Sequence, residues 1–175
     1  IAHYQEALRR DPADKSVWIL VGDLRALLQE FREAIDSFDR AIQLAPDDPQ
    51  PLIKKGRSLE ALEMNDNALQ SYDLAIGINP DIAEAWRLKG SALMKLDKPE
   101  AALRAYEHAL NLDSTDHSSK EGVEKADAMV KQMRIEDYAR AVLDFEHSHG
   151  RPVTKEEAFK VAGIPYAYLD DVLAY

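Results

Sequence analysis

The sequence predicts an all-α protein built as a tandem array of helix pairs. Similar residues recur at a fixed period of 34 positions. Within each period the apolar residues follow helical spacing, and two helices joined by a turn fit one period. The chain has only 7 glycines and is 46% apolar, which suits helices around a buried core. The recurring residues are Trp18, Val21, Gly22, Leu28, Ala34, Phe38, Ala41 and Pro46; Leu52, Lys55, Gly56, Leu59, Leu62, Ala68, Tyr72, Ala75 and Pro80; and Trp86, Lys89, Gly90, Leu93, Leu96, Ala102, Tyr106 and Ala109.

Capping and stop signals place the helices along the chain. Asp14 is expected to cap one helix, and Asp48 with Pro49 to open another. Asp81 with Glu84 has the spacing of a capping box. Prolines stop second helices, because the residue before a proline avoids the helical region. The expected helical segments are residues 1–10, 15–30, 32–44, a pair from 49 to 78 and a pair from 81 to 112.

Glycines recur inside the first helix of each period, where glycine costs about 1 kcal/mol relative to alanine. A cost repeated at one register predicts a close approach by the paired helix. The glycines are Gly22, Gly56 and Gly90. The small residues expected opposite them are Ala34, Ala68 and Ala102, and the rings expected to fill the space toward the next repeat are Phe38, Tyr72 and Tyr106.

The pattern W-x2-[VK]-G, A-x3-[FY]-x2-A and P at this period resembles the tetratricopeptide repeat, over residues 1–116. The resemblance implies a helical-hairpin solenoid of about three and a half repeats. Residues 1–10 match a second helix, so we expect a chain that starts within a repeat of a longer array. Arg25 departs from the usual aromatic residue or leucine, and Ser114 replaces the third stop proline.

After residue 116 the period fades. Ser118 with Glu121 is expected to cap a helix to residue 133 that covers the end of the array. We therefore expect domains at residues 1–133 and 134–175. In the second domain we expect a helix from residue 135 to Gly150, and one at 155–162 capped by Thr154 and Glu157. A last helix at 168–173 completes a unit that resembles a helix-turn-helix. This unit is expected to dock on apolar surface of the array or to form a homodimer.

In the tetratricopeptide family the first helices line a concave groove that holds a peptide or partner helix. The resemblance therefore implies a protein-interaction scaffold without enzymatic activity. Arg57 and Arg87 favour an acidic partner. Chaperone-binding members clamp a terminal carboxylate, but of the matching positions here only Lys54 fits, so that specificity is not expected. The matching groove positions are Ile19, Asp23, Ala26 and Leu27; Ile53, Lys54, Arg57 and Glu60; Arg87, Ser91, Met94 and Lys95; and Lys125.

Composition and motifs weigh against other functions. The net charge of −10 offers no broad basic field for nucleic acid. A transcriptional regulator with a C-terminal helix-turn-helix stays an alternative, although the expected recognition helix at 166–175 carries Asp170 and Asp171 and no Lys or Arg. His147 and His149 point apart on a helix, so we expect neither a metal site nor a cofactor. No membrane span, signal peptide or cysteine is visible, which favours a cytoplasmic protein.

Overall fold

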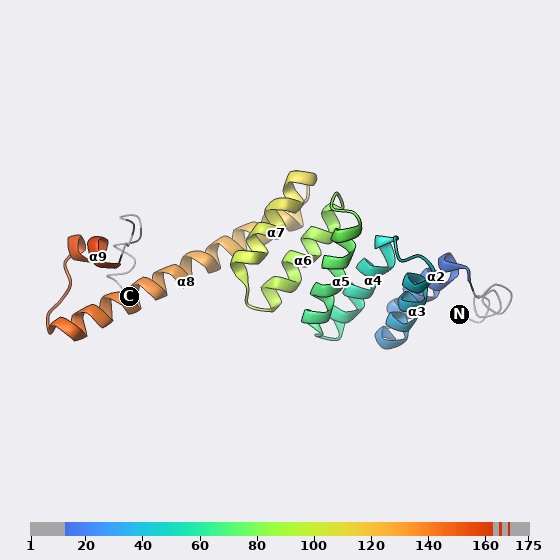
Figure 1. Cartoon of the computed structure of the whole chain (residues 1–175), viewed down its shortest axis with the longest axis horizontal. Coiled ribbons are helices and arrows are strands. Elements are labelled where there is room, and N and C mark those ends of the chain that lie inside the picture. Colours follow the sequence, from blue (N-terminus) through green and yellow to red (C-terminus); the bar gives the residue numbers. More distant parts are fainter. Residues whose placement is uncertain (1–12, 163–164, 166–167, 169–175) are drawn as a thin grey trace. The chain divides into compact units, whose positions relative to one another are not determined.

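A computed structural model describes residues 13–162, 165 and 168, and this part of the chain is all-helical, as expected (Figure 1). The expected segments at 1–10 and 168–173 lie outside the described residues, Tyr168 excepted. No described helix is both long and apolar enough to cross a membrane. The helices are α2 Lys15–Leu27, α3 Phe31–Leu44, α4 Pro49–Ala61, α5 Asn65–Ile78, α6 Ala83–Lys95, α7 Pro99–Leu112, α8 His117–His149 and α9 Lys155–Ala162.

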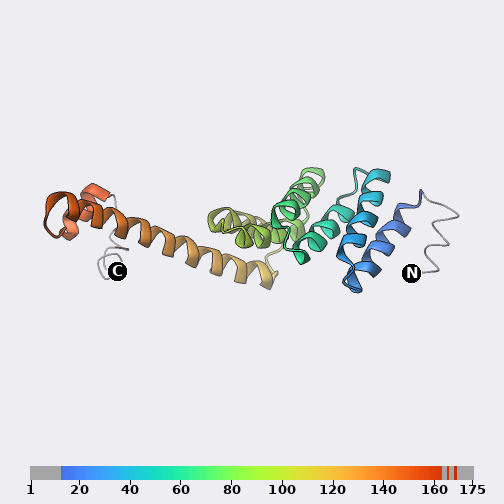
Figure 2. The same ribbon diagram turned by 90° about the horizontal axis from the view of Figure 1, so that it is seen from below.

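The chain divides into two compact units, residues 1–126 and 127–175. In the first unit α2 pairs with α3, α4 with α5 and α6 with α7, and successive pairs stack side by side (Figures 1 and 2). The first helices α2, α4 and α6 also contact one another in order. The solenoid of helical hairpins that the sequence predicts is confirmed.

Three of the five helix caps expected from the sequence are confirmed, at Asp14, at Asp48 and at Thr154 with Glu157, and two are wrong. The Asp14 carboxylate accepts from the Ser16 N–H at 2.9 Å, and Asp48 accepts from the Gln50 N–H at 3.0 Å. The box of Asp81 and Glu84 does not form, because α6 begins after Ile82 and the Glu84 carboxylate pairs with Arg57 instead.

Asp116, rather than Ser118 with Glu121, caps α8. Its carboxylate accepts from the Ser118 N–H at 3.0 Å and from the Ser119 hydroxyl at 2.6 Å. The cap therefore lies two residues earlier than the sequence suggests, and the helix begins at His117.

The turn inside each pair uses the same backbone conformation. Gln29, Glu63 and Asp97, 34 residues apart, have φ angles of 62°, 60° and 55°. This left-handed region is unfavourable for residues with a Cβ atom. Each pair therefore carries one strained residue at the point where the chain reverses.

The helix glycines mark a close approach, but the neighbour is the aromatic ring of the paired helix rather than the alanine. A Cβ atom on Gly22 would lie 2.4 Å from a Phe38 ring carbon, and one on Gly56 would lie 2.3 Å from Tyr72. Gly90 and Gly122 both face Tyr106, at 2.8 and 2.6 Å. The expectation that Ala34, Ala68 and Ala102 lie directly opposite the glycines is therefore wrong, although all three alanines are fully buried.

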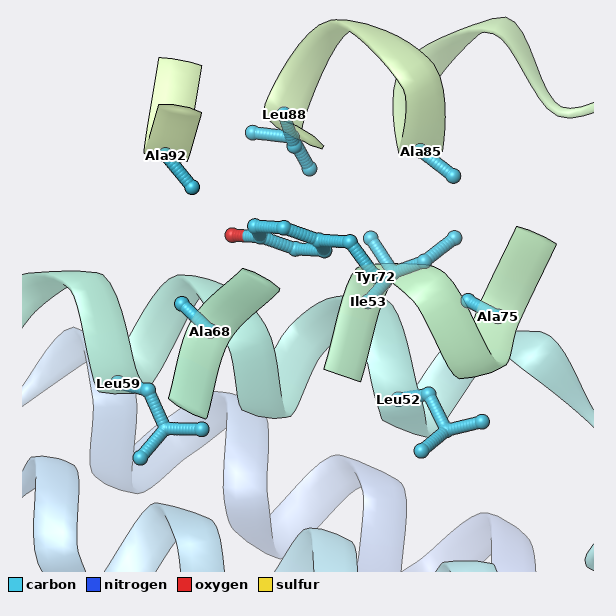
Figure 3. Close-up of a cluster of buried hydrophobic side chains, with 9 residues drawn as sticks. All are labelled: Leu52, Ile53, Leu59, Ala68, Tyr72, Ala75, Ala85, Leu88 and Ala92. Carbon is cyan, nitrogen blue, oxygen red and sulfur yellow. The ribbon is translucent and has the colours of Figure 1, made fainter. Parts of the chain in front are cut away.

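The rings also fill the space toward the next repeat, as expected. Tyr72 is fully buried and lies between Ala68 of its own helix and Ala85, Leu88 and Ala92 of α6 (Figure 3). Glycine on one side and alanines on the other let two helices close around one large ring. This contact joins consecutive repeats into a continuous core.

A single helix, α8, takes the place of the two helices that were expected at residues 118–133 and 135–150. α8 runs unbroken from His117 to His149, through the expected domain boundary at 133–134. No glycine or proline lies between Gly122 and Gly150, so nothing in the backbone forces a break. Gly150, at φ 65°, ends the helix as expected. The expected domains, an array with its capping helix at residues 1–133 and a C-terminal unit at 134–175, stay a prediction.

The second unit has a small core of its own. Ala139 and Val142 of α8 are buried with Ala158 of α9, and Tyr138 packs against Tyr168. The expected capping box of α9 is confirmed: the Glu157 N–H donates to the Thr154 hydroxyl at 3.2 Å, and the Thr154 N–H donates to the Glu157 carboxylate at 3.1 Å.

Candidate protein-binding groove

The residues that the sequence places in the groove lie on the first helices α2, α4 and α6, except Lys125 of α8, and they differ in exposure. Ile53 is only 2% exposed and belongs to the core, so the expectation that it contacts a ligand is wrong. Ile19, Asp23, Lys54, Arg87, Ser91 and Met94 are half-buried. Arg57, Lys95 and Lys125 are exposed. Of the residues expected in the groove, Ile53 is therefore part of the core, while the others keep part or most of their surface exposed.

Ion pairs cross from each first helix to the next. The Lys54 ammonium lies 2.8 Å from the Asp23 carboxylate, and the Lys95 ammonium lies 2.7 Å from Glu60. Arg57 lies 3.2 Å from the Glu84 carboxylate. These pairs fix the spacing of neighbouring repeats.

Arg87 is paired as well, at 3.4 Å from the Asp116 carboxylate. Both arginines that the sequence offers to an acidic partner are therefore already paired with carboxylates of this chain. Among the described residues Lys125 alone of the five expected groove cations has no ion pair. Arg57 keeps 60% of its side chain exposed, so its guanidinium can still donate to a ligand.

An open pocket of about 510 Å³ lies between α2 and α4. Its wall combines Ala26 and Leu27 of α2 with Phe31 and Phe38 of α3, and the Leu27 side chain is 80% exposed. The sequence did not single out Phe31, which lies at the start of a second helix rather than on the groove register. The charged residues of the rim are Asp23, Lys54 and Arg57.

Below the groove, two buried tyrosines sit among its charges. Burial raises the pKa of Tyr72, and the neighbouring Glu60 carboxylate raises it further. The Tyr72 hydroxyl and Glu60 Oε1 are both buried and find no hydrogen-bond partner of good geometry among the described residues. Burial also raises the pKa of Tyr106, while Arg87 and Ser91 act in the opposite direction. The hydroxyl groups of Tyr72 and Tyr106 are therefore both neutral and add no charge beneath the groove.

The histidines near the end of α8 do not converge. The His149 ring stacks on Phe145 with centroids 4.0 Å apart, and its Nδ1 lies 2.8 Å from the Ser148 hydroxyl. Within the part of the chain that the structure describes, no three His, Cys, Asp or Glu side chains are grouped for a metal ion. The expected recognition helix at 166–175 lies outside the described residues, except Tyr168.

Comparisons with known proteins agree with this architecture. The first tetratricopeptide domain of Spaghetti (RPAP3), solved bound to the HSP90 peptide SRMEEVD, is 22% identical with a TM-score of 0.65, over 66% of this chain and 92% of that chain. The Sgt2 tetratricopeptide domain from Aspergillus fumigatus is 21% identical with a TM-score of 0.67, over 69% and 82%. MamA is 16% identical with a TM-score of 0.67, over 98% and 83%. At these identities the similarity shows the fold.

Sequence comparison gives the family. No curated protein sequence matches the chain. Family profiles described as tetratricopeptide repeat match residues 1–49, 49–82 and 83–116, so the matched segments follow one another along the whole array. With this register, the paired helices and the similar solved domains, the chain belongs to the tetratricopeptide repeat family.

Proposed function

We propose that this protein is a protein-interaction scaffold that binds a peptide or partner helix along α2, α4 and α6. The pocket around Leu27 carries the proposal. The Leu27 side chain is 80% exposed and lies next to Ala26 and Phe31, so these side chains form an apolar surface that a partner would cover. A relative, the Spaghetti domain, is described as bound to an HSP90 peptide, which supports a peptide as the kind of ligand.

The charges around this pocket define the partner further. Because Lys54 already pairs with Asp23, a ligand carboxylate would have to compete for it. Arg57 is the better contact, since it makes a single 3.2 Å ion pair and is 60% exposed. We therefore propose a ligand with a large apolar side chain for the pocket and an acidic residue for Arg57. Apolar contact supplies most of the affinity, and the acidic residue sets the register.

Leu27→Glu tests this proposal, with Leu74→Glu as the matched control. Both leucines are largely exposed, at 80% and 61%, so neither change should shift the free energy of unfolding by more than about 0.5 kcal/mol. Leu74 lies on the second helix α5. Peptides would be selected from a displayed random library on the wild-type protein, and their affinity measured by calorimetry.

Selected peptides should bind Leu27→Glu about tenfold or more weakly, because burying a leucine side chain is worth about 1.5–3 kcal/mol. Their affinity for Leu74→Glu should be unchanged. If both variants bind equally well, or if no peptide is enriched at all, the groove is not the binding surface.

A further inference from the structure

The array has a second kind of pocket, formed by two second helices and by the first helix between them. It lies between α5 and α7, above α6, and has a volume of about 420 Å³. Leu69, Trp86 and Leu93 give it apolar walls. It shares no lining residue with the pocket between α2 and α4 and includes none of the expected groove residues.

The wall of this pocket is held in place before any ligand arrives. The Trp86 indole N–H donates to the Pro80 carbonyl at 2.8 Å. The Trp86 ring stacks on His108 with centroids 4.0 Å apart and planes 11° from parallel. The Lys89 ammonium lies 5.2 Å from the Trp86 ring centroid and 2.7 Å from the Asp73 carboxylate. A tryptophan side chain held by three partners loses little conformational entropy when a ligand binds.

One positive charge at this pocket is not neutralised. Lys89 is paired with Asp73, but Arg104, which also lines the pocket, is exposed and has no ion pair with any described residue. The acidic residues Glu100 and Glu107 of the same helix do not come within ion-pair distance of it. The Arg104 guanidinium is therefore available to a ligand beside the apolar walls of the pocket. Its fork of N–H donors matches a carboxylate.

The preceding repeat supplies an internal comparison. A pocket of about 270 Å³ lies at the same register between α3 and α5, above α4. There Leu52 and Leu74 stand in place of Trp86 and His108, and Gln70 stands in place of Arg104. The Lys55–Asp39 pair at 2.7 Å repeats the Lys89–Asp73 pair. Between these two pockets the shape and the ion pair are thus shared, whereas the tryptophan wall and Arg104 belong to the pocket at Trp86.

We propose that the pocket at Trp86 is a second docking site, for a segment of a partner protein that carries a large apolar side chain beside a carboxylate. The apolar side chain lies against Trp86 and Leu93, and the carboxylate accepts hydrogen bonds from Arg104. The site is independent of the groove, so one molecule can hold two partners at once.

Trp86 itself reports on the site. The chain has 2 tryptophans, so Trp18→Phe leaves Trp86 as the only one. Capped peptides of equal length that carry a Phe beside a Glu, a Gln or a Lys are titrated into this variant, followed by tryptophan fluorescence and by nitrogen-15 chemical shifts. The Phe–Glu peptide is expected to bind about tenfold more tightly than the Phe–Gln peptide, since a charge-assisted bond replaces a neutral one.

Arg104→Gln is the decisive variant, and it copies the residue of the preceding repeat. It should abolish the preference for Glu over Gln, whereas Gln70→Ala and the groove variant Leu27→Glu should leave it intact. The proposal is overturned if Arg104→Gln keeps the preference, if the Phe–Lys peptide binds as well, if the shifts map to α2 and α4, or if none of the peptides changes Trp86 fluorescence. Shifts on α2 and α4 would still support the groove, so the two proposals fail separately.

Discussion

Gly56→Ala should destabilise the array, although alanine is the better helix former. A Cβ atom at this position would lie 2.3 Å from Cε1 and 2.7 Å from Cζ of Tyr72, where ordinary contacts begin at 3.4 Å. The ring would have to move by about 1 Å, in a core at native packing density. Tyr72 is fully buried against Ala85, Leu88 and Ala92 of the next repeat, so the ring cannot move away without displacing these side chains (Figure 3).

Two opposing terms set the size of the effect. Alanine gains about 1 kcal/mol over glycine in a helix interior. Overpacking a core costs about 1–3 kcal/mol. We therefore expect Gly56→Ala to lower the free energy of unfolding by up to about 2 kcal/mol. Gly77→Ala is the matched control, because an added Cβ at Gly77 of α5 would meet no described atom within 4 Å. It should gain up to about 1 kcal/mol.

Urea denaturation followed by circular dichroism measures both changes. Repeating Gly56→Ala in a Tyr72→Leu background completes a double-mutant cycle, in which the cost of the alanine should shrink once the ring is absent. The reasoning is refuted if Gly56→Ala stabilises the protein as Gly77→Ala does, or if its cost is the same with and without the ring.

Three further predictions concern the helix ends. Glu63→Asn should raise the free energy of unfolding by up to about 1 kcal/mol in urea denaturation, because Glu63 has φ 60° and asparagine tolerates that region better; a decrease would contradict this account. Asp14→Ala should cost about 1 kcal/mol and speed hydrogen exchange of the first amides of α2, whose cap it removes; unchanged exchange would show that the cap is dispensable. Arg151 and the Thr154 N–H lower the pKa of Glu157 to about 2 from a reference value of 4.5, so their stabilisation of α9 is present above pH 4.5 and lost as the pH falls toward 2. Amide shifts of α9 should follow that titration, and Glu157→Gln should remove it; a transition that survives in Glu157→Gln would have another cause.

The helical hairpins were predictable because their signal repeats. A glycine occurs at the same register in three repeats, at Gly22, Gly56 and Gly90. An error in interpreting one repeat is therefore corrected by the other two. What surrounds each glycine was less predictable, since the sequence does not say whether the ring or the alanine of the paired helix faces it. Arg25 illustrates a local departure. Its guanidinium donates to the Glu33 carbonyl at 3.0 Å and the Ser37 hydroxyl at 3.2 Å, so it ties the first pair together where an apolar residue would pack.

Features that depend on distant partners were predicted less well. Glu84 fits a capping box by spacing, but Arg57 lies 27 residues away in sequence and competes for its carboxylate. Asp116 likewise caps α8 and pairs with Arg87. The unbroken α8 was missed because the change of apolar pattern near residue 134 suggested a boundary, whereas a change of buried face does not by itself end a helix. Charge pairing across repeats cannot be read from a single register.

The central claim is that the face of α2, α4 and α6 binds a peptide, and methyl and amide chemical-shift mapping tests it most directly. A peptide selected on the wild-type protein would be titrated into isotope-labelled full-length chain. The account predicts saturable shifts at Ala26, Leu27 and Phe31, with a weaker response at Arg57, and their loss in Leu27→Glu. Shifts confined to the second helices α3, α5 and α7, away from this pocket, would contradict it.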